Sequence, residues 1–404
     1  MHYTFATILL MELVSQGSPK LTHMKRTNVL FVIFGGDILG GSERLVYSLV
    51  TNLHRDSFNP SVACIGDSVF EGFRNLDIRV YAVPKKRRFD IAALRMLARI
   101  IRDDNIHVVN AHHFMPMIYS FYGAKIANHS ALVYTEHSVW EMERISRCWR
   151  RIGQHLLRSV DSIVGVSSTV TTQLMRSFET RPSQVKTIFN GVKLDAVEVQ
   201  GQPPTKESLN IARGERVIGM VANFKKIKNH LFLLKAFQEL VTDDKQEIKL
   251  LLIGQSFSRN EEDAEPEIRR FVSANALEKN ILLLGYREDV PALLGVMDIF
   301  CLTSFREGLP ISLLEAMAAG LPVVGTDVDG IRDVIIDGRN GYLIQIGDVP
   351  GLKCALNTLL RNESLRTKMG QESQAMAKER FGLEGCIKQY ESLFLSLFDP
   401  GLKV

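Results

Sequence analysis

Residues 297–326 read MDIFCLTSFREGLPISLLEAMAAGLPVVGT and predict a strand, a polar loop and a helix. The apolar run from Met297 to Leu302 predicts the strand, and residues 303–308 form the loop. Pro310 suits the first turn of the helix, because its missing N–H has no partner there. Gly320 and Pro322 mark the end of the helix. The sequence therefore predicts a helix that begins directly after the polar loop.

The start of this helix is a candidate binding site for a pyrophosphate. The first N–H groups of a helix lack partners and carry the positive end of its dipole, and Gly308 lets a bulky anion approach the backbone. At about 100° per residue, Glu307 and Glu315 lie on similar faces, spaced along the helix axis by on the order of 12 Å. One carboxylate could reach a sugar and the other a ribose, with the phosphates between them.

This motif, a glutamate, seven residues and a second glutamate in the setting EGLPISLLEAMAAGLPVV, resembles the signature of retaining glycosyltransferases with the GT-B fold, in family 4. The resemblance spans roughly Val29 to Phe398. It implies an α/β fold with two doubly wound, Rossmann-like domains that face each other across a cleft. It also implies that Glu315 binds the ribose and that the sugar and pyrophosphate are bound by Glu307 and the backbone of Gly308, Leu309, Pro310 and Ile311.

The chain length fits two domains. A chain of 404 residues with 46% hydrophobic and 23% charged residues is typical of a globular protein with domains of roughly 170 to 200 residues. We expect a disordered or mis-started tail over residues 1–27, an acceptor-side domain over 28–195, a linker over 196–213, a nucleotide-sugar domain over 214–380 and, by resemblance, a helix over 381–404 that crosses back to the first domain. The five cysteines are scattered, which favours a reducing cytoplasm and argues against a disulfide framework or zinc site.

Positive charge is concentrated in the first half of the chain. Residues 25–195 carry 23 Lys/Arg against 15 Asp/Glu, whereas residues from 196 onward carry 25 against 29. The basic residues cluster at 85–88, at 95, 99 and 102, and between 144 and 158. Such clusters attract anionic lipids or phosphorylated acceptors, although they are also typical of solvated helix faces. No apolar run is long enough to span a bilayer, and no basic region precedes the short apolar run at residues 8–11 as it would in a signal peptide. We therefore expect a cytoplasmic protein, with peripheral contact to the inner face of the membrane as a possibility and with no nucleic-acid partner.

The first half alternates strand and helix patterns, which predicts a parallel sheet. The buried strand over 29–34 leads into a glycine-rich turn, and Gly40 and Gly41 resemble the family segment that lines the cleft floor. Two further strands end in VVNAHHF and VYTEHSVW, so His112 and His137 are expected at the sheet edge where ligands bind. By resemblance, His112 contacts the transferred sugar and His137 is a second cleft residue. We expect strands also over 60–65, 78–82, 107–111, 131–135, 162–166 and 185–192.

The second half opens with a strand pattern over 217–224, followed by a loop rich in lysine. A lysine at the end of a parallel strand can neutralise the diphosphate that gains charge as the glycosidic bond breaks. Lys228 matches the lysine of the family pattern, whereas Asn223 stands where an arginine is commonest. Lys225 or the neighbouring Lys226 is the candidate for supplying the second positive charge. Further strands are predicted over 249–254 and 281–285, and Tyr286 is a candidate for stacking on the nucleobase.

Residues 327–329 imitate an Asp-x-Asp metal motif, but no other ligand cluster accompanies them. We therefore expect no metal and no cofactor other than the nucleotide-diphosphate sugar as co-substrate. The resemblance implies transfer to a hydroxyl of a glycan or lipid-linked acceptor, with retention at the anomeric carbon, in the synthesis of a surface polysaccharide. A sugar-nucleotide epimerase, a synthase of soluble disaccharides and a catalytically silent scaffold of the same fold remain alternatives.

Overall fold

The computed structural model describes residues 26–36, 40–87, 89–138, 145–194, 203–242, 247–256 and 262–398. Some predicted segments lie outside the described residues. These are the tail up to residue 25, residues 196–202 of the linker, and Arg88 and Arg144 of the basic clusters. Thr27, which the prediction left in the tail, is the first residue of a strand and is buried.

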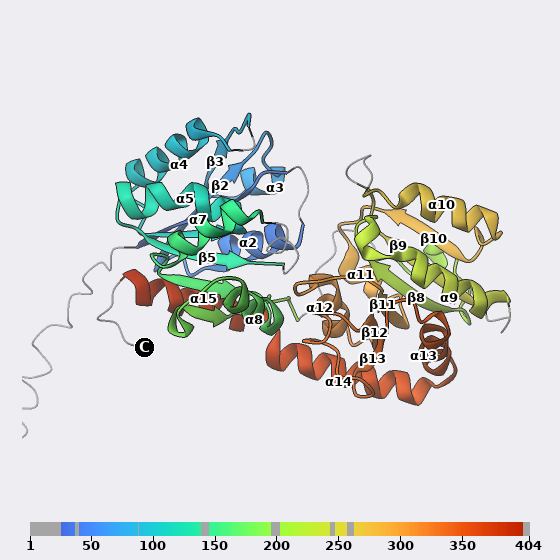
Figure 1. Ribbon diagram of the computed structural model, residues 1–404. Helices are drawn as coiled ribbons and strands as arrows, with labels where there is room; N and C mark the ends of the chain where they lie inside the picture. Colours follow the sequence, from blue (N-terminus) through green and yellow to red (C-terminus); the bar gives the residue numbers. More distant parts are fainter. Residues whose placement is uncertain are drawn as a thin grey trace, which may run out of the picture.

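Two separate parallel sheets organise the chain (Figure 1). The first has seven strands in the order β3-β2-β1-β4-β5-β6-β7. They are β1 (Thr27–Phe34), β2 (Phe58–Ile65), β3 (Arg79–Val83), β4 (Val108–His112), β5 (Ala131–Glu136), β6 (Ser162–Gly165) and β7 (Val185–Thr187). The central strands are almost completely buried, because helices cover both faces of the sheet. The expected doubly wound α/β architecture is confirmed for this half.

The second sheet has six strands in the order β10-β9-β8-β11-β12-β13. They are β8 (Arg216–Val221), β9 (Ile248–Ile253), β10 (Ile281–Gly285), β11 (Ile299–Leu302), β12 (Val323–Thr326) and β13 (Gly341–Ile344). In each sheet the strand order changes direction at the strand that comes first in the sequence, β1 in one sheet and β8 in the other. A ligand site in such a fold lies beyond the carboxyl ends of the strands near that change of direction. The helix that follows β11 is α12 (Ile311–Ala318).

The remaining helices cover these sheets. In the first half they are α2 (Gly41–Asn52), α3 (Glu71–Arg74), α4 (Ile91–Asp103), α5 (Phe114–Phe121), α7 (Arg147–Leu157) and α8 (Ser168–Ser177), with a π-helical turn at Tyr122–Ala127. In the second half they are α9 (His230–Thr242), α10 (Glu265–Ala274), α11 (Val290–Leu294), α13 (Val349–Arg361) and α14 (Glu363–Arg380). Short 3₁₀ turns occupy Pro182–Gln184, Glu207–Leu209 and Lys226–Lys228.

The last helix, α15 (Leu383–Phe398), returns to the first domain (Figure 1). Phe394 packs edge-on against Phe31 and Phe58, with ring centroids 6.0 and 6.3 Å apart. Glu391 accepts hydrogen bonds from the backbone N–H of His54 at 2.8 Å and from its ring at 2.7 Å. The first hydrophobic core is therefore completed by the end of the chain.

Several predicted boundaries are wrong by a few residues. The strand expected over 185–192 ends at Thr187, because Asn190 turns toward the second domain and Val192 forms a bridge with Gly382. The strand expected from Met297 begins at Ile299, because Met297 belongs to the turn after α11, where its N–H donates to the carbonyl of Leu294. The predicted strands over 217–224 and 107–111 shift to Arg216–Val221 and Val108–His112.

Candidate active site

An ion pair between Lys228 and Glu307 lies at the carboxyl edge of the second sheet. The Lys228 Nζ donates to Glu307 Oε1 at 2.6 Å, and the Ser304 hydroxyl donates to the same oxygen at 2.5 Å. The side chain of Glu307 is 9% exposed and that of Lys228 is 21% exposed. Lys228 closes the 3₁₀ turn after β8, whereas Glu307 lies in the loop after β11, and these strands are neighbours. The fold thus brings together two of the predicted residues.

The loop that carries Glu307 is fixed by hydrogen bonds to its neighbours. The buried Thr303 hydroxyl donates to the carbonyl of Asn229 at 3.0 Å, and the N–H of Phe305 donates to the carbonyl of Ile227 at 2.8 Å. Gly330 has φ +78° and packs so closely on the loop that a Cβ there would lie 2.4 Å from the Gly308 carbonyl oxygen. The carboxylate of Glu307 is therefore held on a preorganised loop.

Gly308 also approaches the first domain closely. A Cβ on Gly308 would lie 1.7 Å from the carbonyl oxygen of His137, which directly follows β5. Beside it, the Nδ2 of the buried Asn190 donates to the carbonyl oxygen of Leu309 at 3.2 Å. Pro310 is the N-cap of α12, one position before its expected place within the first turn. The start of α12, including the partly buried Ile311, thus lies at the boundary between the domains.

The second glutamate of the motif is bound from the other domain. Arg44, in the first turn of α2, donates from Nη1 to Glu315 Oε1 at 3.3 Å. The other carboxylate oxygen, Oε2, is buried and has no hydrogen-bond partner among the described residues. Burial raises the pKa of Glu315, although Arg44 opposes this shift. A buried acceptor without a partner is costly, so a hydroxyl that donates to Oε2 would be bound favourably. Gly40 and Gly41, at the start of α2, are exposed and lie one turn before Arg44.

The two predicted histidines contact each other at the carboxyl edge of the first sheet. His112 Nδ1 lies 2.8 Å from His137 Nε2, and His112 Nε2 lies 3.1 Å from Asn110 Oδ1. The His112 side chain is fully buried, whereas His137 is only partly buried. Direct contact of His112 with a sugar stays a prediction, and it would require movement of the His137 ring.

The other predicted donor-binding residues lie along the same edge of the second sheet. Asn223 and Lys225 follow β8, and the buried Oδ1 of Asn223 has no hydrogen-bond partner among the described residues. Lys226, the alternative to Lys225, forms a 3.6 Å ion pair with Glu267. Tyr286 is 36% exposed and follows β10, which is three strand positions from β11, or roughly 14 Å at the usual strand spacing.

The Asp-x-Asp segment is occupied by internal contacts. Asp327 bonds to Arg332 and accepts from Gln345 Nε2 at 2.6 Å, and Asp329 lies 3.6 Å from Arg332. Within the described ranges, no group of three or more His, Cys, Asp or Glu residues could hold a metal ion. Among those same residues, no helix has the length and apolar character that a membrane span needs.

Two family models match this chain in tandem. The model described as Glycosyltransferase Family 4 matches residues 39–196, and the model described as Glycosyl transferases group 1 matches residues 202–376. The chain belongs to the family 4 glycosyltransferases. The motif with Glu307 and Glu315 falls within the second match, and the segment with His112 and His137 falls within the first. The recognition made from the sequence is therefore confirmed.

This glycosyltransferase has similar relatives in several bacteria. It is 27% identical over 331 residues to the N-acetyl-alpha-D-glucosaminyl L-malate synthase of Bacillus anthracis, covering 80% of this chain and 83% of the relative. It is 21% identical over 336 residues to the UDP-Gal:alpha-D-GlcNAc-diphosphoundecaprenol alpha-1,3-galactosyltransferase of Escherichia coli, covering 80% and 85%.

Solved structures of glycosyltransferases share the fold. Anabaena HepE in complex with UDP-glucose superposes with a TM-score of 0.80 at 20% identity, covering 92% of this chain and all of that one. WaaG, a glycosyltransferase involved in lipopolysaccharide biosynthesis, superposes with a TM-score of 0.71 at 16% identity, covering 91% and 99%. The predicted GT-B fold is confirmed.

Three residues that complete the site were not predicted from the sequence. Ser304, Arg44 and Asn110 each bond directly to a predicted residue. Asn110 could have been predicted, because it precedes His112 by two residues, and residues two apart on a strand point to the same face. Ser304 had only its place in the polar loop as a signal. Arg44 had none, because its partner lies 271 positions away in the other domain.

Proposed function

We propose that this glycosyltransferase transfers a sugar from a nucleotide-diphosphate sugar to a hydroxyl of a glycan or lipid-linked acceptor, with retention at the anomeric carbon. The observation that carries the proposal is the Lys228–Glu307 pair beside the start of α12, where the adjacent Gly308 meets the backbone of His137 in the first domain. A cation and unpartnered helix N–H groups favour a diphosphate, and the nearby carboxylate can accept hydrogen bonds from sugar hydroxyls. The relatives include a galactosyltransferase named for UDP-Gal, which supports this class of donor.

The proposed chemistry takes place on one face of the sugar. The bond between the anomeric carbon and the leaving phosphate oxygen breaks, and a bond to the acceptor oxygen forms on the same face. The acceptor hydroxyl proton passes to the departing phosphate. Lys228 and the start of α12 would stabilise the negative charge that grows on the diphosphate. Glu307 would orient the sugar, and Glu315 would accept a hydrogen bond from the ribose through its unpartnered Oε2.

We further propose that the reaction needs no metal ion. Lys228 and the dipole of α12 supply positive charge where a metal would otherwise neutralise the diphosphate. Lys225, which lies in the same loop, is the proposed source of a second charge, because Asn223 cannot provide one. The nucleobase would lie toward Tyr286 at the edge of the sheet.

The donor can be identified by thermal unfolding of the purified chain with a panel of nucleotide sugars, each with and without Mg²⁺. A ligand near 100 times its Kd should stabilise the folded chain by about 2.7 kcal/mol. We expect one UDP-, GDP- or ADP-sugar to raise the melting temperature equally with and without Mg²⁺. A shift that requires Mg²⁺ would contradict the metal-free site. Binding without transfer would favour a silent scaffold, and conversion of the donor without any acceptor would favour an epimerase.

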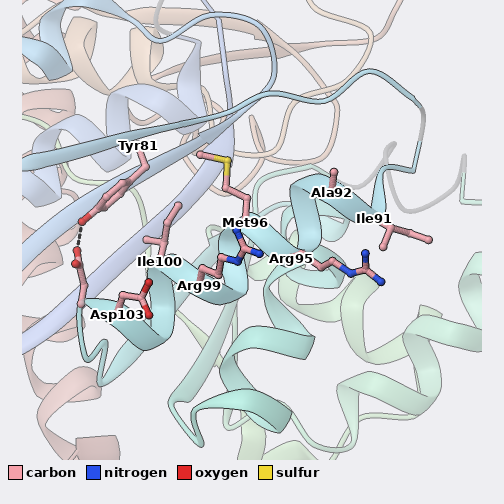
Figure 2. A pocket seen from close by; sticks show the side chains of 9 residues that line it. Tyr81, Ile91, Ala92, Arg95, Met96, Arg99, Ile100 and Asp103 are labelled. Carbon is pink, nitrogen blue, oxygen red and sulfur yellow. Dashed lines mark hydrogen bonds between the residues drawn. The ribbon is translucent and has the colours of Figure 1, made fainter.

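The first domain offers a basic surface for a lipid-linked acceptor at the inner face of a membrane. Lys85, Lys86 and Arg87 lie in the loop after β3, at the same sheet edge as His112. The loop leads into α4. Together with Tyr81 of β3, the α4 residues Ile91, Arg95, Met96, Arg99 and Asp103 line much of a groove of about 810 Å³ (Figure 2). Ile91 is 58% exposed, and Met96, which lies between Arg95 and Arg99 in the sequence, is 39% exposed. Apolar side chains among basic ones suit the interface of an anionic bilayer.

Reversing the charges of this loop is expected to weaken membrane binding. In vesicles with anionic lipid, the combined variant Lys85→Glu, Lys86→Glu and Arg87→Glu should bind at least tenfold more weakly, since each basic residue near the surface contributes about 1 kcal/mol. The control is the reversal of three exposed basic residues of the second domain, Lys279, Arg361 and Lys368. Co-sedimentation at low and high salt measures both. Equal binding of the two variants would contradict a membrane role for the loop.

A further inference from the structure

A chain of hydrogen bonds links Asn110, His112 and His137 at the carboxyl edge of the first sheet. Asn110 and His112 are alternate residues of β4 and therefore share one face, and His137 follows the paired strand β5. The Asn110 Oδ1 lies 3.1 Å from His112 Nε2, and His112 Nδ1 lies 2.8 Å from His137 Nε2. Asn110 and His112 have no exposed surface, so their bonds are sheltered from exchange with solvent.

The orientation of the Asn110 amide sets the first proton of this chain. The Nδ2 of Asn110 lies 2.9 Å from the Thr135 hydroxyl and 3.5 Å from the Val133 carbonyl oxygen. A carbonyl oxygen can only accept, so the NH₂ group must be the one on that side. Its Oδ1 then faces His112 and requires a proton on His112 Nε2.

The remaining protons follow from the neutrality of both rings. Burial lowers the pKa of His112 to about 3, and burial lowers the pKa of His137 well below its ordinary value. A neutral imidazole has one donor and one acceptor nitrogen. With its proton on Nε2, His112 accepts at Nδ1, so the Nε2 of His137 must donate to it. The lone pair of His137 is then on Nδ1.

His137 is the outer member of the chain and lies at the domain boundary. Its carbonyl oxygen meets Gly308, near the end of the loop that leads to α12, and His137 is partly exposed whereas His112 is fully buried. The His113 ring lies on another side of it, with centroids 4.9 Å apart, and faces Glu136 at 3.4 Å. The N–H of His137 donates to Glu136 at 2.8 Å, which fixes the backbone that carries the ring.

We propose that Asn110 and His112 are positioning residues that hold His137 in the tautomer with the proton on Nε2, so that its Nδ1 accepts a hydrogen bond from a hydroxyl of the sugar or acceptor. The hydroxyl itself rests on the proposed transferase function. The tautomer rests only on the bonds within the first domain. In this arrangement the histidine that meets the substrate is His137, and His112 acts through it.

The tautomer is measured directly on the full chain labelled with ¹⁵N-histidine. The protonated and unprotonated nitrogens of a neutral imidazole resonate far apart, and a His137→Gln variant assigns the signals of His137. We expect His137 to be protonated on Nε2 alone, with no protonation of His112 between about pH 8 and pH 5, the range in which an ordinary histidine titrates. A proton on Nδ1 of His137 would overturn the proposal, whether or not any sugar is transferred.

Two substitutions at Asn110 test the control of the tautomer. Asn110→Leu keeps the size of the side chain but removes the acceptor for His112, so His137 should show both tautomers. The kcat should fall about tenfold, which is the equivalent of one hydrogen bond, and the donor KM should change little. Asn110→Asp keeps the acceptor but adds a negative charge beside His112, which favours the protonated ring; His112 Nδ1 should then donate to His137 Nε2 and shift the proton of His137 to Nδ1. An unchanged His137 spectrum in Asn110→Leu would overturn the proposal. If the wild-type chain shows the expected tautomer but transfers no sugar, the proposed function fails and the hydrogen-bond chain stands.

Discussion

Replacing Lys228 by alanine is expected to reduce kcat for sugar transfer by roughly a hundredfold to a thousandfold. This is the usual effect of removing one preorganised group that stabilises charge in the transition state. The Lys228 Nζ is 2.6 Å from Glu307, so the substitution also leaves a carboxylate that is 9% exposed, with the Ser304 hydroxyl as its one side-chain donor among the described residues. We expect a loss of about 1–3 kcal/mol in the free energy of unfolding. The partial exposure of Lys228 keeps this loss below that of a fully buried pair.

The two effects can be separated with a second variant and a matched control. In Lys228→Ala combined with Glu307→Gln, no unpaired charge remains, so the melting temperature should recover while transfer stays lost. Lys249 and Glu215 form a comparable ion pair, with nitrogen and oxygen 3.1 Å apart and side chains 13% and 16% exposed, at the opposite edge of the sheet. Lys249→Ala should lower stability and keep kcat. Transfer by Lys228→Ala within tenfold of the wild type would refute the assignment.

Gly308→Ala is expected to reduce kcat by about a hundredfold without comparable loss of stability. The new methyl group would lie 1.7 Å from the carbonyl oxygen of His137, and its three nearest atoms all belong to the backbone of His137 and Ser138, so the loop must move away from the first domain. A misplacement of about 1 Å at a reacting centre costs on the order of a hundredfold in rate. Most of the proposed donor contacts lie in the second domain, so the donor Kd should change less than kcat.

Gly385→Ala is the matched control for this substitution. Gly385 lies in α15, and a Cβ there meets no heavy atom within 4 Å. The added methyl should leave kcat unchanged and favour the helix slightly. Steady-state kinetics and isothermal titration with the donor compare the two variants. If Gly308→Ala retained the kcat of Gly385→Ala, close approach at Gly308 would not be needed for transfer.

The fold could be predicted because its signals are local. Buried parallel strands are continuous apolar runs, and those at Val29–Phe34 and Ile281–Gly285 are recognisable without any knowledge of their partners. The short strand β13 was not predicted separately, because Gly341–Ile344 has only four residues and sits between turns. The π-helical turn at Tyr122–Ala127 likewise has no distinct sequence pattern.

The site was only partly predictable for a different reason. Lys228 and Glu307 each follow a strand at the same edge, so their proximity follows from the topology. The contact of Arg44 with Glu315 depends on how the two domains sit against each other, which no local pattern encodes. The order of the histidines is also hidden, because both end neighbouring strands and only side-chain packing decides that His112 is the buried one.

The return of α15 to the first domain has a consequence for how the chain assembles on the ribosome. The contact between His54 and Glu391 joins residues 337 positions apart, and all strands of the second sheet lie between them. A nascent chain therefore holds every strand of the second domain before it holds the helix that covers Phe31 and Phe58. The first domain, although made first, is the last to close its core, and the apolar surface at Phe31 and Phe58 stays uncovered until Phe394 arrives, the kind of exposure that makes an intermediate prone to aggregate.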